Sequence, residues 1–226
     1  MTICIVVGME QEAELVRRAC PKAIIVISAG NATLLAEKLA EAIAAGANHI
    51  ISVGICGGLN PSLRAGDIVI GTSIIYGLSQ ITSDLSWCDR LFAALVPKPP
   101  SIHVMQGWFT WSETAVARLS DKAALRKTTG GDAVDEETFI AGSIAATKGI
   151  SFTALRAVSD SADFELPPAA LVKLQADGNE NIGAILDSIA GNPWQIPELV
   201  ELAGSTATAM ANLKLALTKI GPNFMI

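Results

Sequence analysis

Carboxylates that stand directly beside apolar runs are the residues of this 226-residue chain whose types and spacing suit chemistry. They occur in "GMEQEAELV", which contains Glu12, in "AVDEETFIA", which contains Glu136 and Glu137, and in "RAVSDSAD", which contains Ser159 and Asp160. A carboxylic acid kept protonated by burial can donate a proton, and an ionised carboxylate can accept one. These residues therefore suit general acid–base catalysis.

Each of these stretches also has a purely structural explanation. Ser159 or Asp160 could simply cap a turn. Acids in the first turn of a helix are favoured by the helix dipole by roughly 0.3–1 kcal/mol, which would account for Glu12 and for some of the acids in "AVDEETFIA". The dipole explains Glu137 least well, because apolar residues follow it at once and the helix turns inward there. The residues alone leave both explanations open.

Other catalytic and cofactor motifs are absent from the sequence. The stretch "GICGGL" (Gly54 to Leu59) is not GxGxxG, and it could bring backbone close to a ligand or merely make a tight turn. There is no Walker A motif, no GxSxG and no histidine cluster, and His49 and His103 lie at strand starts, away from the expected ligand end of the sheet. The cysteines lack a CxxC spacing and are expected as free thiols: Cys4, Cys20, Cys56 and Cys88. We expect no metal and no cofactor.

The composition points to one compact domain in a reducing compartment. Half of the residues (50%) are hydrophobic and only 17% are charged, which argues against disorder. The formal net charge of −6 disfavours nucleic acid as a partner. No apolar run is long enough to span a membrane, and the N-terminal stretch lacks the basic region of a signal peptide. A cytoplasmic protein is expected, and the apolar content fits burial of some surface in an oligomer.

Alternating strand and helix patterns predict an α/β fold. The expected strands and helices follow each other from Thr2 to Asp160, and the rest of the chain reads as helices separated by Gly, Asn and Pro. The strands are expected at 2–9, 23–30, 49–59, 66–77, 101–111 and 149–160, and helices at 10–19, 31–46 and 111–125, with another beginning in "AVDEETFIA". Asn31 is expected to cap the second helix.

This pattern indicates a single three-layer α/β/α domain with a mixed, largely parallel sheet. Residues 1–163 would form the core that carries the site, and residues 164–226 a helical C-terminal appendage. In such folds ligands bind beyond the carboxyl ends of the strands. Glu12, the "GICGGL" loop, Trp108, Phe109 and Asp160 all fall at those ends.

Four stretches in order, "GMEQE", "GICGGLNPSLRAGDIVI", "AVDEETFIA" and "LRAVSDSAD", resemble the purine nucleoside phosphorylase and methylthioadenosine/S-adenosylhomocysteine nucleosidase superfamily. The resemblance covers about Thr2 to Asp163, and the ordered set is far more specific than any member of it. The remainder looks most like the hopanoid-associated branch, which is thought to release adenine from adenosylhopane. The resemblance implies a nucleoside phosphorylase-like fold, a small-molecule nucleoside substrate and a homodimer.

The resemblance also implies roles for individual residues. Asp160 matches the general acid that protonates adenine at N7, and Ser159 the residue that orients it. Glu12 matches the carboxylate that activates the attacking water, and Glu137 the acceptor for the ribose hydroxyls. Ile55, Cys56 and Gly57 match the loop beside the nucleophile, and Trp108 and Phe109 fall near the segment that walls the base.

Three residues depart from the family pattern. Glu136 stands where members usually have a Met that packs beneath the ribose, Ile55 replaces a position that is often small or polar, and Trp108 is bulkier than is common. An unpaired carboxylate at residue 136 would be costly to bury.

Three functions are therefore considered: an adenine-releasing nucleosidase, a phosphorylase that takes phosphate as co-substrate, and a nucleoside-binding protein without catalysis. The nucleosidase is preferred to the phosphorylase because "VGMEQEAEL" offers acids and no arginine, and phosphate needs cationic donors.

Overall fold

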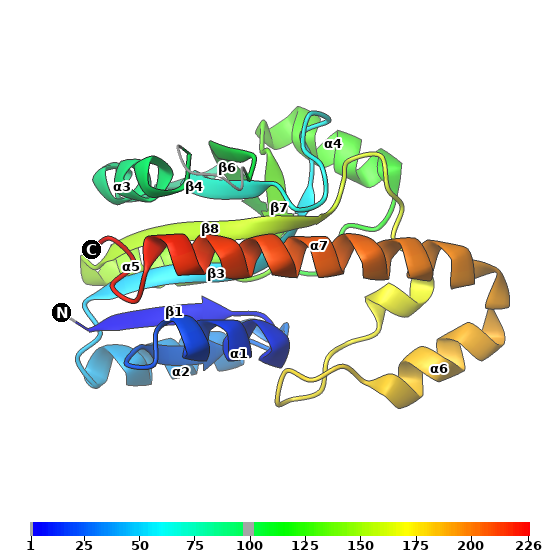
Figure 1. Ribbon diagram of the computed structural model, residues 1–226, viewed down its shortest axis with the longest axis horizontal. Coiled ribbons are helices and arrows are strands. Elements are labelled where there is room, and N and C mark those ends of the chain that lie inside the picture. The colour runs from blue at the N-terminus through cyan, green and yellow to red at the C-terminus, as the bar shows by residue number, and fades with distance from the viewer. Residues whose placement is uncertain (1, 97–101) are drawn as a thin grey trace.

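The computed structural model describes residues 2–96 and 102–226, and its centre is an eight-stranded mixed sheet (Figure 1). The strands are β1 (Ile3–Val7), β2 (Ile24–Ile27), β3 (His49–Gly58), β4 (Ile68–Tyr76), β5 (Ser79–Thr82), β6 (Val104–Trp111), β7 (Ala133–Asp135) and β8 (Ser151–Asp160). The helices are α1 (Glu10–Ala19), α2 (Ala32–Ala44), α3 (Leu85–Leu95), α4 (Leu119–Thr129), α5 (Thr138–Lys148), α6 (Ile182–Gly191) and α7 (Ile196–Ile220), with short 3₁₀ turns η1 (Pro168–Leu171) and η2 (Pro193–Gln195).

The sheet brings together strands that are far apart in the sequence. Its order is β2-β1-β3-β7-β6-β4-β5, and β8 pairs with both β3 and β4. β1, β3 and β8 run parallel to one another as neighbours, so their carboxyl ends meet at one edge. β7 pairs antiparallel with the end of β3, and β4 pairs antiparallel with β5 and β8. The predicted mixed, largely parallel sheet is confirmed.

Helices cover the sheet on both faces, which makes the predicted three layers. Buried apolar side chains of α1, α3 and α7 pack with one set of strand residues, and those of α2 and α5 pack with the other set. β1 is buried along its whole length, as expected for a strand covered on both faces. Asn31 caps α2 as predicted, because its side chain accepts a hydrogen bond from Leu34 N–H at 3.0 Å.

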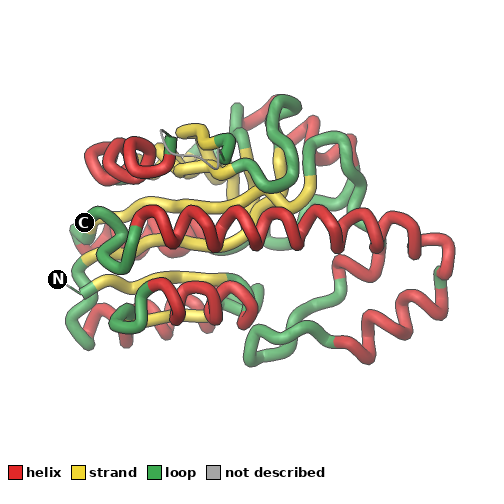
Figure 2. Tube along the Cα trace, in the orientation of Figure 1, coloured by secondary structure: helices red, strands yellow, loops and turns green. Residues whose placement is uncertain are grey.

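The C-terminal part is helical, as predicted, and extends beyond the sheet (Figures 1 and 2). The second half of α7 packs on the sheet, whereas its first half and α6 project away from it. Before α6, the chain returns to the start of α1, where Gly178 C=O accepts a hydrogen bond from Glu10 N–H at 3.0 Å. The projecting part exposes large apolar side chains: Leu171, Ile182, Leu186, Trp194, Ile196 and Val200. No helix among residues 2–96 and 102–226 is long and apolar enough to cross a membrane.

Several elements differ from the sequence expectations. The strands β5 and β7 and the helix α3 were not expected. The helix expected over 111–125 begins only at Leu119, because Trp111 is still the last residue of β6. Of the stretch "VPKPPS", expected as a polar connection, only Val96 lies within the described residues.

Candidate active site

Glu12 lies buried where the carboxyl end of β1 meets β3. Its Oε2 accepts hydrogen bonds from Gly8 N–H at 2.7 Å and Met9 N–H at 3.1 Å, and its Oε1 accepts one from Ile55 N–H at 2.7 Å. Burial raises the pKa of Glu12 to about 7, although the Arg156 charge and these amides act in the opposite direction. A carboxylate that titrates near neutral pH is well matched to accept a proton from water.

The backbone of β3 leaves room for this carboxylate only because residue 54 is glycine. A Cβ at Gly54 would lie 2.8 Å from Glu12 Cδ. The backbone at Gly8, directly after β1, lies similarly close to the Glu137 carboxylate, since a Cβ there would be 3.1 Å from Oε1. The glycines at these strand ends therefore let two carboxylates approach the backbone directly.

Arg156, in β8, joins the carboxylates of this site. Its Nη2 donates to Glu137 Oε2 at 2.8 Å, and its Nε lies 2.5 Å from Asp135 Oδ2. Its remaining bonds go to Ser52 Oγ at 2.7 Å, to the Ile55 carbonyl at 2.9 Å and, from Nε, to Thr138 Oγ1 at 3.3 Å. Burial alone would lower the pKa of Arg156, but Asp135, Glu137 and the nearby Glu12 raise it above its usual value. Most N–H groups of the guanidinium are therefore bonded to neighbours within the protein.

Glu137 is held from two sides. Ser28 Oγ donates to its Oε1 at 2.9 Å, opposite the bond from Arg156. The sequence favoured a helix start for the acids around it, but Asp135 ends β7 and α5 begins only at Thr138. Asp135 bonds to the Thr138 backbone N–H at 3.2 Å and to its hydroxyl, so it is this acid that caps the helix.

Asp160, the last residue of β8, is also buried and both of its oxygens are bonded. Ser159 Oγ donates to Oδ1 at 2.6 Å, and the Lys122 ammonium donates to Oδ2 at 2.6 Å. Lys122 comes from α4, and its side chain is only 1% exposed. A lysine beside this carboxylate was not expected from the sequence.

The loop residues expected beside the nucleophile do border the carboxylates. Ile55 bonds Glu12 through its N–H and Arg156 through its carbonyl. The Cys56 carbonyl accepts a hydrogen bond from Ser159 Oγ at 3.1 Å, and a Cβ at Gly57 would lie 3.3 Å from Asp160 Oδ2. Burial raises the pKa of the Cys56 thiol well above its usual value, so this sulfur stays neutral.

The residues expected to wall the base make no contact with these carboxylates that the structure records. Phe109 is completely buried, and its ring lies beside Gly71 and Ala154 in the core. The Trp108 ring lies near Gly130 and is 43% exposed.

Glu136 lies at the rim of the site. Its carboxylate faces the backbone at Gly30, where a Cβ would lie 3.5 Å from Oε2. Burial, reinforced by the charges of Glu137 and Asp135, raises the pKa of Glu136 to about 7. The Glu136 side chain is partly buried, and it forms no ion pair with any residue of 2–96 or 102–226.

Four residues of the site were missed by sequence reasoning: Ser28, Lys122, Asp135 and Arg156. Arg156 was assigned no role, although a charged residue within an apolar strand signals a buried partner. Asp135 was grouped with the helix-start acids. Lys122 and Ser28 lie on separate elements with no local pattern that distinguishes them.

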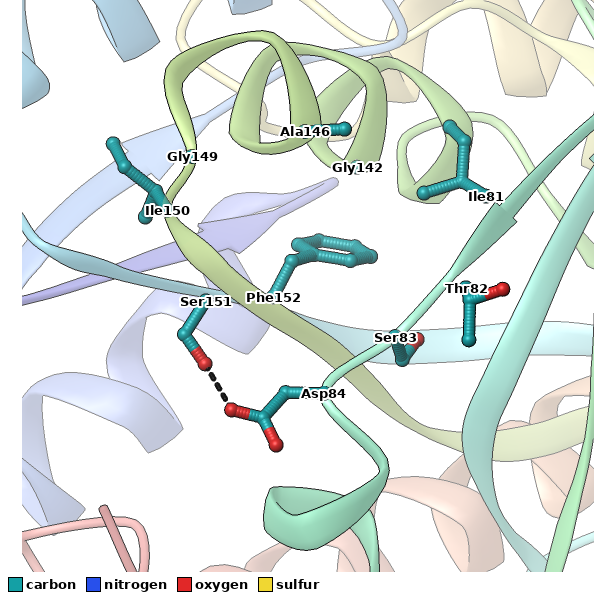
Figure 3. Close-up of a pocket in the computed structure, with 10 residues that line it drawn as sticks. All are labelled: Ile81, Thr82, Ser83, Asp84, Gly142, Ala146, Gly149, Ile150, Ser151 and Phe152. Carbon is teal, nitrogen blue, oxygen red and sulfur yellow. Dashed lines mark hydrogen bonds between the residues drawn. The ribbon is translucent and has the colours of Figure 1, made fainter.

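Two surface hollows lie outside this cluster. One hollow, of about 410 Å³, lies at the start of β8, the opposite end from Asp160. Figure 3 shows the residues that line it, among them Ser151, which donates a hydrogen bond to Asp84. Ser83 Oγ, on its wall, is the one buried side-chain polar atom without a partner in the described part of the chain. A second hollow, of about 480 Å³, lies against α4 and includes Arg126, Lys127 and Ala162. The described residues contain no cluster of three or more His, Cys, Asp or Glu that could hold a metal.

Comparison with known proteins identifies a family and a shared fold. Residues 22–190 match the family model described as the phosphorylase superfamily, a span that includes Glu137, Ser159 and Asp160 but begins after Glu12. No curated protein sequence matches the chain.

Solved structures of nucleosidases have the same fold. The 5′-methylthioadenosine/S-adenosylhomocysteine nucleosidase of Neisseria meningitidis, in complex with methylthio-immucillin-A, is 20% identical with a TM-score of 0.70, over 98% of this chain and 99% of its own. That of S. pneumoniae, with a transition-state inhibitor, is 16% identical with a TM-score of 0.67, over 97% and 100%. A futalosine hydrolase mutant of Helicobacter pylori is 13% identical with a TM-score of 0.64, over 92% and 98%. At these identities the likeness establishes the fold.

Proposed function

Because this chain belongs to the phosphorylase superfamily, we propose that it is an N-ribosyl hydrolase that releases adenine from a 5′-substituted adenosine. The observation that carries the proposal is the convergence of Glu12, Glu137 and Asp160, which come from separate parts of the chain and are all buried at one edge of the sheet. Burying three acids is costly, and a fold without chemistry to perform would gain nothing from it.

The positions of Glu12 and Asp160 support separate catalytic roles for these two acids. Glu12 borders Gly54 and Asp160 borders Gly57, so roughly 10 Å of β3 separates them. That span accommodates a sugar with a water on one side and a base on the other. Glu12 would take a proton from the water, and Asp160 would give one to the departing adenine at N7. Such acid–base assistance is typically worth about 10²–10⁴-fold in rate.

Glu137 would bind the sugar. Each of its oxygens already accepts one hydrogen bond, from Ser28 or from Arg156, and each keeps a lone pair for a ribose hydroxyl. The hydroxyls become more acidic as positive charge develops on the sugar, so these bonds strengthen in the transition state. Ile55, Cys56 and Gly57 would line the sugar and the base. Phe109 is fully buried in the core and Trp108 lies near Gly130, so neither is proposed as a wall of the base subsite.

The state of the arginines supports hydrolysis over phosphorolysis. Arg156 uses its N–H groups to contact Asp135, Glu137, Ser52 and Ile55, so few of them remain to bind a phosphate. Arg64 donates to the carbonyls of its own loop.

The surface of the projecting part supports a proposal for the substituent on the 5′ carbon. The projecting part of α6 and α7 exposes apolar side chains, which suits a substrate with an apolar 5′ group such as adenosylhopane, with methylthioadenosine and S-adenosylhomocysteine as smaller candidates. We propose that the enzyme works as a cytoplasmic homodimer.

The test is product analysis with the purified protein. Methylthioadenosine, S-adenosylhomocysteine and an adenosine with a lipid-like 5′ chain are incubated with and without phosphate, and free adenine is quantified by chromatography. We expect adenine and a free sugar without phosphate, and a loss of about 10²–10⁴-fold in Asp160→Asn. Asp163→Asn, which changes an exposed acid of the same segment, is the control.

Two other outcomes would replace the proposal. Ribose 1-phosphate formed only with phosphate would make the protein a phosphorylase. Saturable nucleoside binding without any product over long incubation would make it a binding protein.

A further inference from the structure

The only buried residue of α4 is charged: it is Lys122, where an apolar residue would be usual. Its Nζ donates to Asp160 Oδ2 at 2.6 Å and to the carbonyls of Ser161 and Phe164, both at 2.8 Å. An ammonium has three hydrogens, and all three have an acceptor here. The geometry is that of a fully satisfied buried cation.

Such an ion pair is a poor device for stability alone. Removing two charges from water costs several kcal/mol per ion, and well-packed apolar residues usually serve a core as well or better. The hydrogen bonds of Lys122 Nζ go to the end of β8 and the segment that follows it, next to the proposed acid. The position of Lys122 therefore indicates a role in proton transfer by Asp160.

We propose that Lys122 is a positioning residue that assists proton transfer from Asp160, by holding its carboxyl group and stabilising the carboxylate that remains once the proton has passed to the purine. This inference rests on the proposed hydrolase function and extends it to a residue outside the set Glu12, Glu137 and Asp160. Lys122 acts through Asp160 and does not need to touch the substrate.

Asp160 takes up a proton from solvent before the bond-breaking step. As the C1′–N9 bond breaks, its electron pair passes to the purine, the O–H bond of Asp160 breaks, and an N7–H bond forms. Asp160 is left as a carboxylate at 2.6 Å from the Lys122 ammonium. Because the carboxylate charge is absent in the protonated complex with substrate and develops as the proton leaves, the ammonium stabilises the transition state more than that complex.

The other groups that face Asp160 do not supply this charge. Ser159 of β8 donates one neutral hydrogen bond, and Cys56 of β3 is a buried thiol that burial keeps protonated by raising its pKa. Asp163, on the segment after β8, is exposed and negative. Among the described residues that contact the Asp160 carboxylate, Lys122 is the cation.

The experiment compares pH–rate profiles of the wild type, Lys122→Met, Lys122→Gln and Lys122→Arg with the best adenine-releasing substrate. Lys122→Gln keeps polar contacts to the carbonyls without the charge, and Lys122→Arg keeps the charge. Lys127→Met, which removes an exposed charge from the same helix, is the control.

We expect both neutral variants to lower kcat about 100-fold with KM changed less than about threefold. The pH–rate profile of both neutral variants should differ from that of the wild type, because the lost charge lies against the carboxyl group that gives up the proton. Lys122→Arg should keep the wild-type profile, and Lys127→Met should match the wild type throughout.

A second substrate separates an acid role from a structural one. A 4-nitrophenyl riboside with the same 5′ group expels a leaving group that needs no proton, so the neutral variants should lose less than about threefold on it. An equal loss on both substrates, or an unshifted pH profile, would overturn the role of Lys122 while leaving the hydrolase function intact. A wild type that releases no adenine from any nucleoside would instead refute the proposed function itself.

Discussion

Arg156 Nη2 donates a hydrogen bond to Glu137 Oε2 at 2.8 Å, and the two side chains are only 2% and 8% exposed. The same guanidinium lies beside Asp135 and lowers the pKa values that burial would otherwise raise further at Asp135 and Glu12. One cation thus stabilises three acids from separate elements.

Arg156→Met should therefore be strongly destabilising. Removing one partner of a buried ion pair typically costs about 3–5 kcal/mol, because the other charge is left without compensation. The acids can lose their uncompensated charge by taking up protons, so the loss in the free energy of unfolding should be smaller at pH 5 than at pH 8. Urea unfolding at both pH values measures it, with Arg118→Met, an exposed pair, as the control. A loss no larger than the control's would contradict the central role of Arg156.

Glu12 should set an acidic limb of the activity profile. Its pKa is raised to about 7 by burial, and only the ionised form can accept a proton from water. We expect kcat/KM for adenine release to rise with pH up to about 7 and this limb to be absent from the residual activity of Glu12→Gln. Glu14→Gln, on the exposed side of the same helix, should behave as the wild type. A profile of Glu12→Gln with an unchanged limb would assign the titration to another group.

The sheet and most of its helices could be predicted because their patterns are local. β1 is a continuous apolar run, β3 and β8 are rich in apolar residues, and α2 has a capping residue in Asn31 and an apolar stripe. The short strand β7 could not be predicted, because its Ala133–Asp135 is held only by pairing with β3 and β6, which depends on the whole sheet. α3 was missed although its signal is local, since Asp84 caps it by accepting a hydrogen bond from Trp87 N–H at 2.9 Å.

The site was predictable where family motifs mark it and not elsewhere. Glu12, Glu137, Ser159 and Asp160 were named from the sequence and are brought together by the fold, and their roles stay predictions. Lys122 could not be found, because nothing in "RLSDKAALRKTT" separates a buried lysine from its exposed neighbours. Its burial is a property of how α4 packs against the end of β8.

Gly54→Ala should impair the site without unfolding the protein. A Cβ at residue 54 would lie 2.8 Å from Glu12 Cδ, so the carboxylate must move away from the Ile55 amide. A misplacement of about 1 Å can cost about 10²-fold in rate, and we expect a loss of that size in kcat. Gly204→Ala in α7, where the added methyl meets nothing within 4 Å, is the matched control and should leave kcat unchanged. Full activity in Gly54→Ala would show that Glu12 can shift freely, contrary to its proposed role.

Glu136→Gln should make the protein more stable at alkaline pH. Burial raises the pKa of Glu136 from 4.5 to about 7, so between these values the folded protein binds a proton that the unfolded chain has lost. Stability therefore falls as pH rises through this window and is level above it. Gln carries no charge and removes this slope, so we expect a gain of about 1–2 kcal/mol at pH 8 relative to pH 4.5, after allowance for partial exposure. Urea unfolding at the two pH values measures it, with Glu113→Gln at an exposed position as the control. An equal gain at both pH values would mean that Glu136 is ionised throughout and that its rim position carries no electrostatic cost.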